Sequence, residues 1–334
     1  MLTYEELSRK PNAFKSITGI TLEEFQTLLV EVEPRYQAAE QKRLARSERK
    51  RAPGGGAKPR YLLLERLLMT MVWLRLYLTC EAVGVLFGVD KSTVSRYTRP
   101  ILLILRDLGA DTLGWPEEAQ ALVAQNETTA ELVGEPIPMI EPEAAAPSAT
   151  SATVHTSADL VAIVDASEQR VERSQDDVTQ KAHYSGKKKA HTRKTQFVAN
   201  EHGRIRDVSA SVPGAVHDVT LFRQSGVIDR LPEDITAMGD NGYQGIQDDM
   251  PDRSVALPYR ASRNHPLTPE QKLHNHEISR IRVVIENTIA ALKHFRILAD
   301  VFRHAIEHYD SIILAIVGIV NRRLGKRLAG LTAA

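Results

Sequence analysis

The sequence predicts an all-α domain followed by an α/β domain with a mixed five-stranded sheet and covering helices. Residues 61–110 hold short apolar helical segments separated by turn residues, and residues 159–330 alternate apolar strand-like runs with helical segments. Residues 111–158 are rich in Ala, Pro, Glu, Ser and Thr, a composition typical of a linker. A chain of 334 residues is long enough for about two domains.

Residues 1–60 are expected to form a helical arm that ends in a basic run and a hinge. Apolar residues from Ile20 to Val32 are spaced for one face of a helix. Lys and Arg are frequent from Lys42 to Arg51, and the segment APGGGAKP at 52–59 follows. Because its glycines and prolines cannot hold a helix, this segment is expected to be a hinge or a flexible arm.

Residues 61–110 have the layout of a helix-turn-helix. Thr79 is expected to cap one short helix. A tight turn is expected from Gly88 to Asp90, and Asp90 is expected to cap the next helix. Pro100 is expected to divide the last helical stretch, because proline interrupts the hydrogen bonds of a helix. The expected helices span 61–78, 80–87, 91–98 and 101–109.

The helix expected at 91–98 is the candidate DNA-reading element. If Val94 faces the core, four polar side chains point away from it and are able to reach a major groove. They are Lys91, Ser92, Thr93 and Arg96. The alternative is a plain helical bundle with no role in nucleic-acid recognition.

The order of elements in 159–330 indicates a ribonuclease-H-like fold. The expected strands are 160–165, a hairpin over 195–212 that turns at His202-Gly203, 235–240 and 254–259, and the expected helices are 217–226, 269–295 and 307–328. Strand, hairpin, helix, strand, helix, strand, helix is the order of that fold. Its first strand is central, and its fourth strand lies beside the first.

Three carboxylates on these elements form a candidate catalytic set. Asp165 and Asp240 follow apolar strand-like runs, and Glu286 lies inside the long helix. Side chains at the ends of neighbouring strands of an α/β sheet converge on one crevice, so we expect these three to meet. Carboxylates that meet in one crevice repel one another unless cations neutralise their charges. A site made only of oxygen ligands favours Mg²⁺ or Mn²⁺. Two such ions support phosphoryl transfer.

Each of these acids also has a purely structural interpretation. Asp165 and Asp240 are able to cap turns after their strands, and Glu286 is able to pair with Arg282 one helical turn earlier. Asp218 competes with Asp240 for the place of second acid, although a helix begins at Asp218 and N-capping explains it better.

Two neighbouring residues are given structural roles. Glu168 is expected at the surface, and the alternative is that it leans into the site from the first strand. His217 is expected to be a hydrogen-bonding residue, because water activated by a metal needs no histidine as general base.

A basic segment next to the expected hairpin is a candidate clamp on the DNA backbone. It contains Lys187, Lys188, Lys189, Arg193 and Lys194, and Arg170 and Arg173 extend it. The alternative is an exposed loop that is basic only because it is solvated.

The sequence resembles the DDE-type transposases of bacterial insertion sequences related to the PIF/Harbinger group. The resemblance rests on VDASEQ (164–169), YSGKKKAHTRKTQ (184–196), PGAVHD (213–218), GDNGYQG (239–245) and RIRVVIENTIAALKHFRIL (280–298), and on the helix-turn-helix unit before them. It implies that Asp165, Asp240 and Glu286 are the three catalytic, metal-binding acids.

The charge distribution agrees with a protein that binds a polyanion. Between Asp107 and Glu168 there are acids and no Lys or Arg, so the basic residues flank an acidic segment, although the net charge is only +1. The single cysteine, Cys80, excludes internal disulfides and a multi-thiolate metal site. No run approaches the ~18 apolar residues that span a membrane, and the N-terminus lacks a signal-peptide layout, so a cytoplasmic protein is expected.

The expected function is therefore DNA transposition. The helix-turn-helix is expected to bind the terminal inverted repeats of the element, and the acids to cleave the ends and join the 3′-hydroxyl to target DNA. A homodimer or larger assembly is expected, because two ends must be brought together. One rival is a DNA-binding regulator, derived from a transposase, that lacks catalysis. Another is a repair or junction nuclease, which leaves the helix-turn-helix unexplained.

Overall fold

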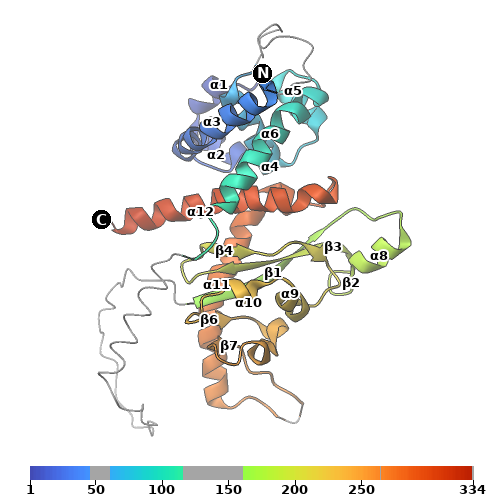
Figure 1. The fold of residues 1–334 in the computed structure, drawn as a ribbon, viewed down its shortest axis with the longest axis vertical. Helices are drawn as coiled ribbons and strands as arrows, with labels where there is room; N and C mark the ends of the chain where they lie inside the picture. The colour runs from blue at the N-terminus through green and yellow to red at the C-terminus, as the bar shows by residue number, and fades with distance from the viewer. Residues whose placement is uncertain (46–60, 116–160, 264, 333–334) are drawn as a thin grey trace.

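The computed structural model describes residues 1–45, 61–115, 161–263 and 265–332. Figure 1 shows a helical part at one end, α12 crossing beneath it, and a sheet on the other side of α12 with α11 running along it. The helices of the helical part are α1 (Tyr4–Ser8), α2 (Pro11–Thr18), α3 (Leu22–Leu44), α4 (Leu63–Leu76), α5 (Cys80–Phe87) and α6 (Lys91–Ala110). Among the described segments, no helix has both the length and the apolar character needed to cross a membrane.

The α/β part contains seven strands in one sheet. The strands are β1 (Val161–Arg170), β2 (Tyr184–Ser185), β3 (Ala190–Ala199), β4 (Ile205–Val208), β5 (Val212–Pro213), β6 (Thr236–Met238) and β7 (Val255–Ala256). Its helices are α8 (Asp177–His183), α9 (Asp218–Gln224), α10 (Val227–Arg230), α11 (Pro269–Lys293) and α12 (Tyr309–Thr332), with short 3₁₀ turns at Asn241–Tyr243, Ile246–Asp249, Arg296–Leu298 and Ile306–His308.

The first helices follow the spacing of their apolar residues. Thr21 and Glu24 form a reciprocal capping box that starts α3. Phe25, Leu28 and Val32 are buried on one face of this helix, as the sequence predicts. They pack in the same hydrophobic core as α4, α5 and α6. The last part of the basic run and the Gly/Pro segment that follows lie outside the described residues.

The helix-turn-helix layout is present. The Thr79 hydroxyl accepts a hydrogen bond from the backbone N–H of Ala82 and caps α5. Gly88 adopts a left-handed conformation (φ +63°) at the end of α5, which a residue with a side chain rarely adopts. Asp90 occupies the N-cap position of α6, but its side chain makes no capping hydrogen bond, contrary to the expectation. Val94 is fully buried, so α6 is anchored through the residue expected to face the core.

The expected break at Pro100 is wrong, because α6 is continuous from Lys91 to Ala110. Proline removes one backbone hydrogen bond from a helix interior. However, Val94, Ile101, Leu105 and Leu108 are buried along one face of α6 and join the main core. This burial on both sides of the proline outweighs the lost hydrogen bond and keeps the two halves in line.

The sheet has the ribonuclease-H-like arrangement. Its order is β2-β3-β1-β6-β7, and β4 and β5 also pair with β3. The pairing of β1 with β3 is antiparallel, whereas β1 with β6 and β6 with β7 are parallel. The five-stranded prediction corresponds to β1, β3, β4, β6 and β7, and two strands of two residues each complete the observed sheet.

The two faces of the sheet are buried by different helices. Ile163 and Phe197 point to the face that packs against Ile285 and Ile289 of α11. Their neighbours Val164 and Val198 point to the other face, which α9 and α10 cover. This alternation along β1 and β3 follows from the pleat of a strand. A site at the strand ends is thus enclosed from both faces.

The first strand is longer than expected. β1 continues to Arg170 because it pairs with β3 from Ile163 onward. The parallel neighbour β6 pairs with β1 only over Val161–Ile163. Asp165 therefore lies within β1 rather than at its end. It still faces an opening, because β6 has ended two residues earlier and leaves that side of β1 without a strand.

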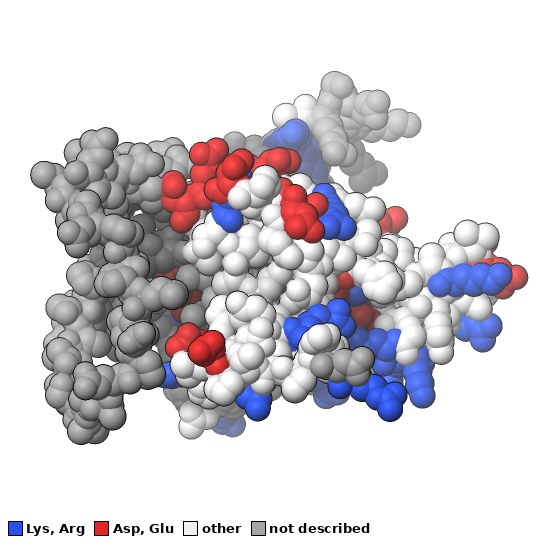
Figure 2. Space-filling model, turned by 90° about the horizontal axis from the view of Figure 1, so that it is seen from below, with Lys and Arg blue, Asp and Glu red and all other residues white. Residues whose placement is uncertain are grey.

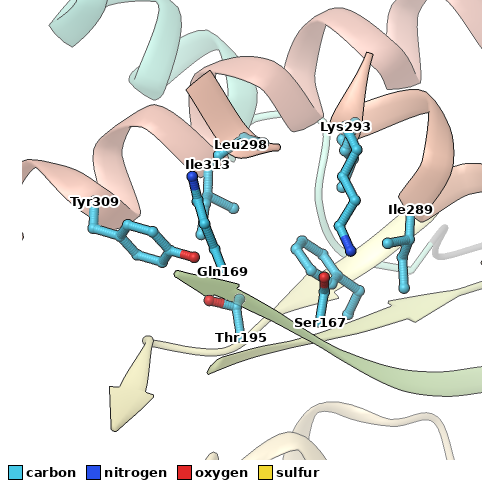
Figure 3. A pocket seen from close by; sticks show the side chains of 10 residues that line it. Ser167, Gln169, Thr195, Ile289, Lys293, Leu298, Tyr309 and Ile313 are labelled. Carbon is cyan, nitrogen blue, oxygen red and sulfur yellow. The ribbon is translucent and has the colours of Figure 1, made fainter. Parts of the chain in front are cut away.

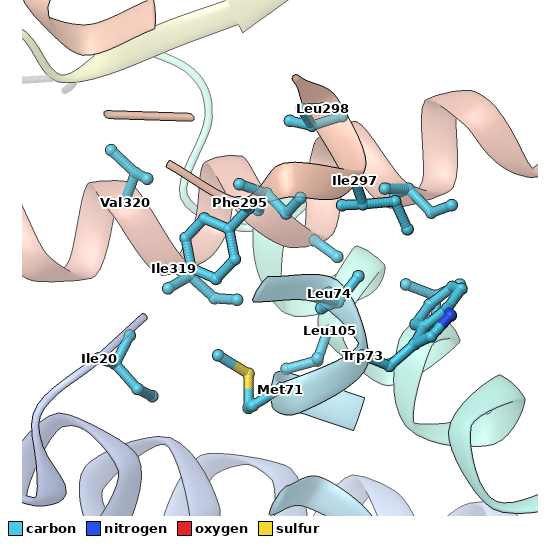
Figure 4. Close-up of a cluster of buried hydrophobic side chains, with 14 of the residues drawn as sticks. Ile20, Met71, Trp73, Leu74, Leu105, Phe295, Ile297, Leu298, Ile319 and Val320 are labelled. Carbon is cyan, nitrogen blue, oxygen red and sulfur yellow. The ribbon is translucent and has the colours of Figure 1, made fainter. Parts of the chain in front are cut away.

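A single apolar core joins the helical part to the α/β part. Figure 4 shows Ile20, Met71, Trp73, Leu74 and Leu105 facing Phe295, Ile297, Leu298, Ile319 and Val320. The first set comes from α4, α6 and the turn between α2 and α3. The second set comes from α12 and the segment that follows α11. The core therefore does not divide at the end of α6.

The helices α6 and α12 cross with their backbones in contact. A Cβ on Gly318 of α12 would lie 2.5 Å from the Cα of Gly109 in α6. A Cβ on Gly109 would lie 1.9 Å from the backbone oxygen of Leu314. Only glycine at both positions permits this approach.

We predict that Gly318→Ala lowers the free energy of unfolding by about 1–3 kcal/mol, because the added methyl forces the two backbones apart. Gly325 lies one to two turns later in α12 with no atom near its would-be Cβ. Gly325→Ala is the matched control, and we expect it to stabilise the protein by about 0.5–1 kcal/mol. Urea denaturation measures both. Equal effects of the two substitutions would contradict the close crossing.

Candidate active site

A crevice of about 660 Å³, open to solvent, lies where β6 leaves β1. Its acidic lining residues are Asp165, Glu168, Asp218 and Glu286. Its basic lining residues are Lys187, Lys188, Lys194 and Lys293. The crevice is therefore rich in both charges, and the partners of each side chain decide which charges are available for a ligand.

Asp165 is held inside the crevice in an unfavourable environment for its charge. Burial, with smaller contributions from the charges of Asp240 and Asp218, raises the pKa of its carboxyl to about 6. The N–H of Ala166, which donates to Oδ1 at 2.8 Å, and the Arg282 guanidinium oppose this increase. Asp165 is a buried carboxyl next to other acids, so a cation beside it would be stabilised.

Asp240 is positioned by the turn GDNGY. Its Oδ1 accepts a hydrogen bond of 2.7 Å from the N–H of Gly242. Gly242 lies against two carboxylates, since a Cβ there would be 2.8 Å from Asp218 Oδ2 and 2.9 Å from Asp240 Oδ1. Asp218 and Asp240 thus approach each other beside this glycine, and any larger residue would separate them.

Tyr243 ends the same turn and packs into the interior of the protein. Its side chain is fully buried, with its ring 6.0 Å from the ring of Phe222 in an edge-on contact. A Cβ on Gly239 would lie 2.9 Å from that of Tyr243, so the turn closes only with glycine there. Burial raises the pKa of Tyr243 well above its usual value, and the charges of Asp165, Asp218 and Asp240 add to this effect. The phenol therefore stays protonated below the acids.

Glu286 reaches the crevice from α11 with a half-exposed side chain. Its Oε1 lies 3.7 Å from Arg282 Nη2, so the ion pair of the structural interpretation is present. The same guanidinium lowers the pKa of Asp165. Arg282 thus acts on two of the three predicted acids. Among the described residues, no group of three His, Cys, Asp or Glu side chains lies close enough together to hold a metal ion.

Asp218 does not cap α9, contrary to the expectation. His217 occupies the N-cap position without a side-chain hydrogen bond, and Asp218 is the first helical residue. Its carboxylate pairs with Lys194 at 2.7 Å. The Lys194 ammonium also donates to the carbonyl of Val216 at 2.6 Å and lies 3.6 Å from Glu168. Asp218 is therefore paired with a cation inside the protein.

The same contacts revise two other expectations. Lys194, predicted to contact DNA, has a side chain that is only 8% exposed and is held by its internal partners. Glu168, expected at the surface, is 9% exposed and accepts a hydrogen bond from Thr192 at 2.9 Å. Glu168 and Lys194 are directly paired across β1 and β3, which explains why both are buried. The cause in both cases is that β3 begins earlier than expected.

Arg193, also predicted to contact DNA, is half-buried and donates hydrogen bonds to the hydroxyl and carbonyl of Ser211. The remaining predicted DNA contacts lie on more accessible surface. The side chains of Arg170, Arg173, Lys187, Lys188 and Lys189 are exposed. On α6, Lys91, Ser92 and Arg96 are exposed, and Thr93 is half-buried and accepts a hydrogen bond from Arg96. Their contacts with DNA remain predictions.

Lys293 was missed by the sequence reasoning. It follows Glu286 by seven residues, which places it on the same face of α11, and this helical spacing is the signal that would have identified it. Figure 3 shows its ammonium pointing toward Ser167 in a smaller pocket of about 290 Å³ that adjoins the crevice. Lys293 lines both pockets, so it lies at the boundary between them.

Asp165 and Glu286 line the crevice and Asp240 does not, but all three predicted acids fit a hard divalent cation by chemical type. Asp165, Asp240 and Glu286 offer only carboxylate oxygens, which Mg²⁺ and Mn²⁺ prefer. The buried Asp165 carboxylate lies close to other acids, and such a group is stabilised when a cation is bound.

Comparisons with known proteins agree with this geometry. The family described as DDE superfamily endonuclease matches residues 164–321, and the family described as the helix-turn-helix of DDE superfamily endonuclease matches residues 63–111. A relative, the probable transposase for insertion sequence element IS702 of Microchaete diplosiphon, is 25% identical over 311 residues, which cover 93% of this chain and 94% of the relative.

Together these matches support a DDE transposase of an insertion sequence. The chain carries the endonuclease domain and the helix-turn-helix DNA-binding domain of that superfamily, whose enzymes use divalent metal ions. No solved structure matches the chain significantly.

We predict that Asp165→Asn stabilises the metal-free protein at neutral pH. The folded carboxyl has a pKa of about 6 against 3.8 for a free Asp. The folded state therefore binds the proton more tightly, and stability falls as the pH rises from about 4 to 6. The amide keeps the acceptor for Ala166 and never ionises. At pH 7.5 in EDTA we expect a gain of about 1–3 kcal/mol, and at pH 3.5 almost none.

Thermal unfolding across this pH range measures the effect, and Asp252→Asn, at an exposed position, is the control. A difference between the Asp165 variant and the parent that stays constant from pH 3.5 to 7.5 would contradict the assigned pKa.

Proposed function

We propose that this transposase cleaves the phosphodiester bonds at the ends of its element and joins the resulting 3′-hydroxyl to target DNA. The observation that supports the proposal is a crevice lined by Asp165 and Glu286, with Asp240 near enough to Asp165 for its charge to raise the pKa of that carboxyl. Asp165 comes from β1, Asp240 from the turn after β6, and Glu286 from α11. Phosphoryl transfer depends mainly on positioned charge, which such a crevice provides.

Two Mg²⁺ or Mn²⁺ ions would be held by Asp165, Asp240 and Glu286. Bound ions of this kind activate an attacking water or hydroxyl and stabilise the leaving oxygen. The protein's own part is to hold the carboxylates in place. The Ala166 N–H orients Asp165, and the Gly242 N–H orients Asp240. Arg282 partly neutralises Asp165 and Glu286 before any ion binds.

The helix-turn-helix is proposed to recognise the terminal inverted repeats of the element. The first turns of α6 carry exposed Lys91, Ser92 and Arg96, side chains that bind bases and phosphates in a major groove. Lys187, Lys188 and Lys189, beside the crevice, are proposed to bind the DNA backbone without reading its sequence. A homodimer or larger assembly would bring both ends together.

A second candidate is a DNA-binding regulator that retains the fold without catalysis. The pairing of Glu286 with Arg282 favours it, because a carboxylate engaged by a guanidinium is less available to a metal. The retained Asp165 and Asp240, with their positioning hydrogen bonds, favour the enzyme. Metal-dependent nicking of an element end distinguishes the two.

We predict that Asp165→Ala, Asp240→Ala and Glu286→Ala each abolish cleavage of an end-containing duplex and leave its binding intact. Each substitution removes a carboxylate from the crevice but no residue of the helix-turn-helix. Gel assays of cleavage and binding on the same preparation measure both properties. Cleavage by the Asp240 variant at the parental rate would transfer its role to Asp218, and cleavage that survives EDTA would refute the metal mechanism.

We predict that the two sets of basic residues affect binding differently. Arg96→Ala and Lys91→Ala should weaken binding to the element ends more than to unrelated DNA. Replacing Lys187, Lys188 and Lys189 by Gln should weaken binding to any duplex and reduce the salt-dependence slope by about 0.9 per lost contact. Competition binding over a range of salt concentrations measures both. An Arg96 variant with unchanged preference for the ends would contradict the assigned recognition helix.

A further inference from the structure

The first half of α11 distributes its charges asymmetrically around the helix. At about 100° per residue, Lys272 and Ser279 lie within about 40° of Glu286, the predicted third acid. The acids Glu270 and Glu277 lie about 160–180° away, on the opposite side. The side of α11 that carries Glu286 is therefore basic or neutral from Lys272 onward.

Two arginines lie in the loop that leads into α11. Arg260, Arg263 and Lys272 are all exposed. None of the three forms an ion pair with another residue of the described chain. We refer to these three residues as the α11 patch. Exposed cations without internal partners are available to an external anion, and grouping them raises the local potential.

The start of this loop is fixed to α11. The N–H of Tyr259 donates to Asn275 Oδ1 at 2.8 Å, and Asn275 Nδ2 donates back to the Tyr259 carbonyl at 2.9 Å. The rings of Tyr259 and His274 also lie 5.0 Å apart. Asn275 lies within about 20° of Glu286 around the helix. Arg260, the next residue along the chain, is thus held near the Glu286 side of α11.

The molecule has one basic and one acidic side when seen from the end where α11 begins. Figure 2 shows most Lys and Arg side chains together over one part of this view, and most Asp and Glu side chains away from them. Lys272 and Glu286 are 14 residues apart on α11, which corresponds to about 21 Å along its axis. About 6 base pairs of duplex DNA span that distance.

We propose that the α11 patch binds the phosphate backbone of duplex DNA about 6 base pairs from the bond that is cut in the crevice. The inference rests on the proposed function, because it takes the crevice as the cleavage site. Lys187, Lys188 and Lys293 line the crevice itself, whereas the α11 patch lies about four helical turns away, toward the start of α11. DNA would then be held on both sides of the acids and would run along α11.

The first test compares two triple variants that remove the same charge. The patch variant is Arg260→Gln, Arg263→Gln and Lys272→Gln. The control is Lys10→Gln, Lys15→Gln and Arg280→Gln, at exposed positions, of which Arg280 is on α11 about 120° from Glu286. With a 40-base-pair duplex of random sequence as the probe, the patch variant should lower the salt-dependence slope by about 2–3. The control should leave the slope unchanged. Equal slopes for the two variants would overturn the proposal.

The second test locates the contact and its source. End-containing duplexes are prepared with flanks that stop 3 or 12 base pairs beyond the cut on either side, and a separate duplex serves as joining target. If the patch variant loses binding only to duplexes with the long flank, the patch contacts the DNA molecule that is cut. A loss only in target capture assigns it to target DNA. Either result supports the contact.

Identical losses with the short and the long flank, combined with normal target capture, would overturn the proposed position. Failure of the parental protein to bind any duplex would instead overturn the proposed function. A normal melting temperature of the patch variant shows that its fold is intact.

Discussion

The contact between the backbones of α6 and α12 at Gly109 and Gly318 is the constraint on which the rest of the architecture depends. It places α6, the second helix of the helix-turn-helix, directly against α12 of the endonuclease domain. Side chains at these positions would separate the two helices and open the apolar core that surrounds them. The helix-turn-helix and the endonuclease domain therefore pack against each other through a shared apolar core.

The continuity of α6 through Pro100 extends this constraint to the recognition residues. The exposed Lys91 and Arg96 lie on the first turns, and the crossing glycine lies at the last turn of the same rod. Any DNA bound at the first turns is consequently held at a defined distance and angle from the crevice. Position along the element relative to the cut would then be set by the length of a helix, which is far stiffer than a flexible linker.

The acids in and beside the crevice differ in how far a nearby cation neutralises their charge. Lys194 neutralises Asp218, and its three acceptors leave it no capacity for DNA. Arg282 only partly neutralises Asp165, whose pKa stays raised by burial. This difference gives a physical reason to favour Asp240 over Asp218 as second acid, because a carboxylate already paired with a buried ammonium attracts a further cation less. The assignment remains a proposal.

The sequence by itself determined the local features: the helix cap at Thr79, the turn at Gly88, the order of strands and helices, and the acids placed on them. These depend on neighbouring residues, so they can be read from spacing. The tertiary structure decided the continuity of α6 through Pro100, the length of β1 and the burial of Lys194. Each of these depends on a partner distant in the chain, since α12 packs on α6, β3 pairs with β1, and Asp218 pairs with Lys194. No local periodicity encodes such a partner, because the energy of burial and of ion pairing appears only when the chain has folded.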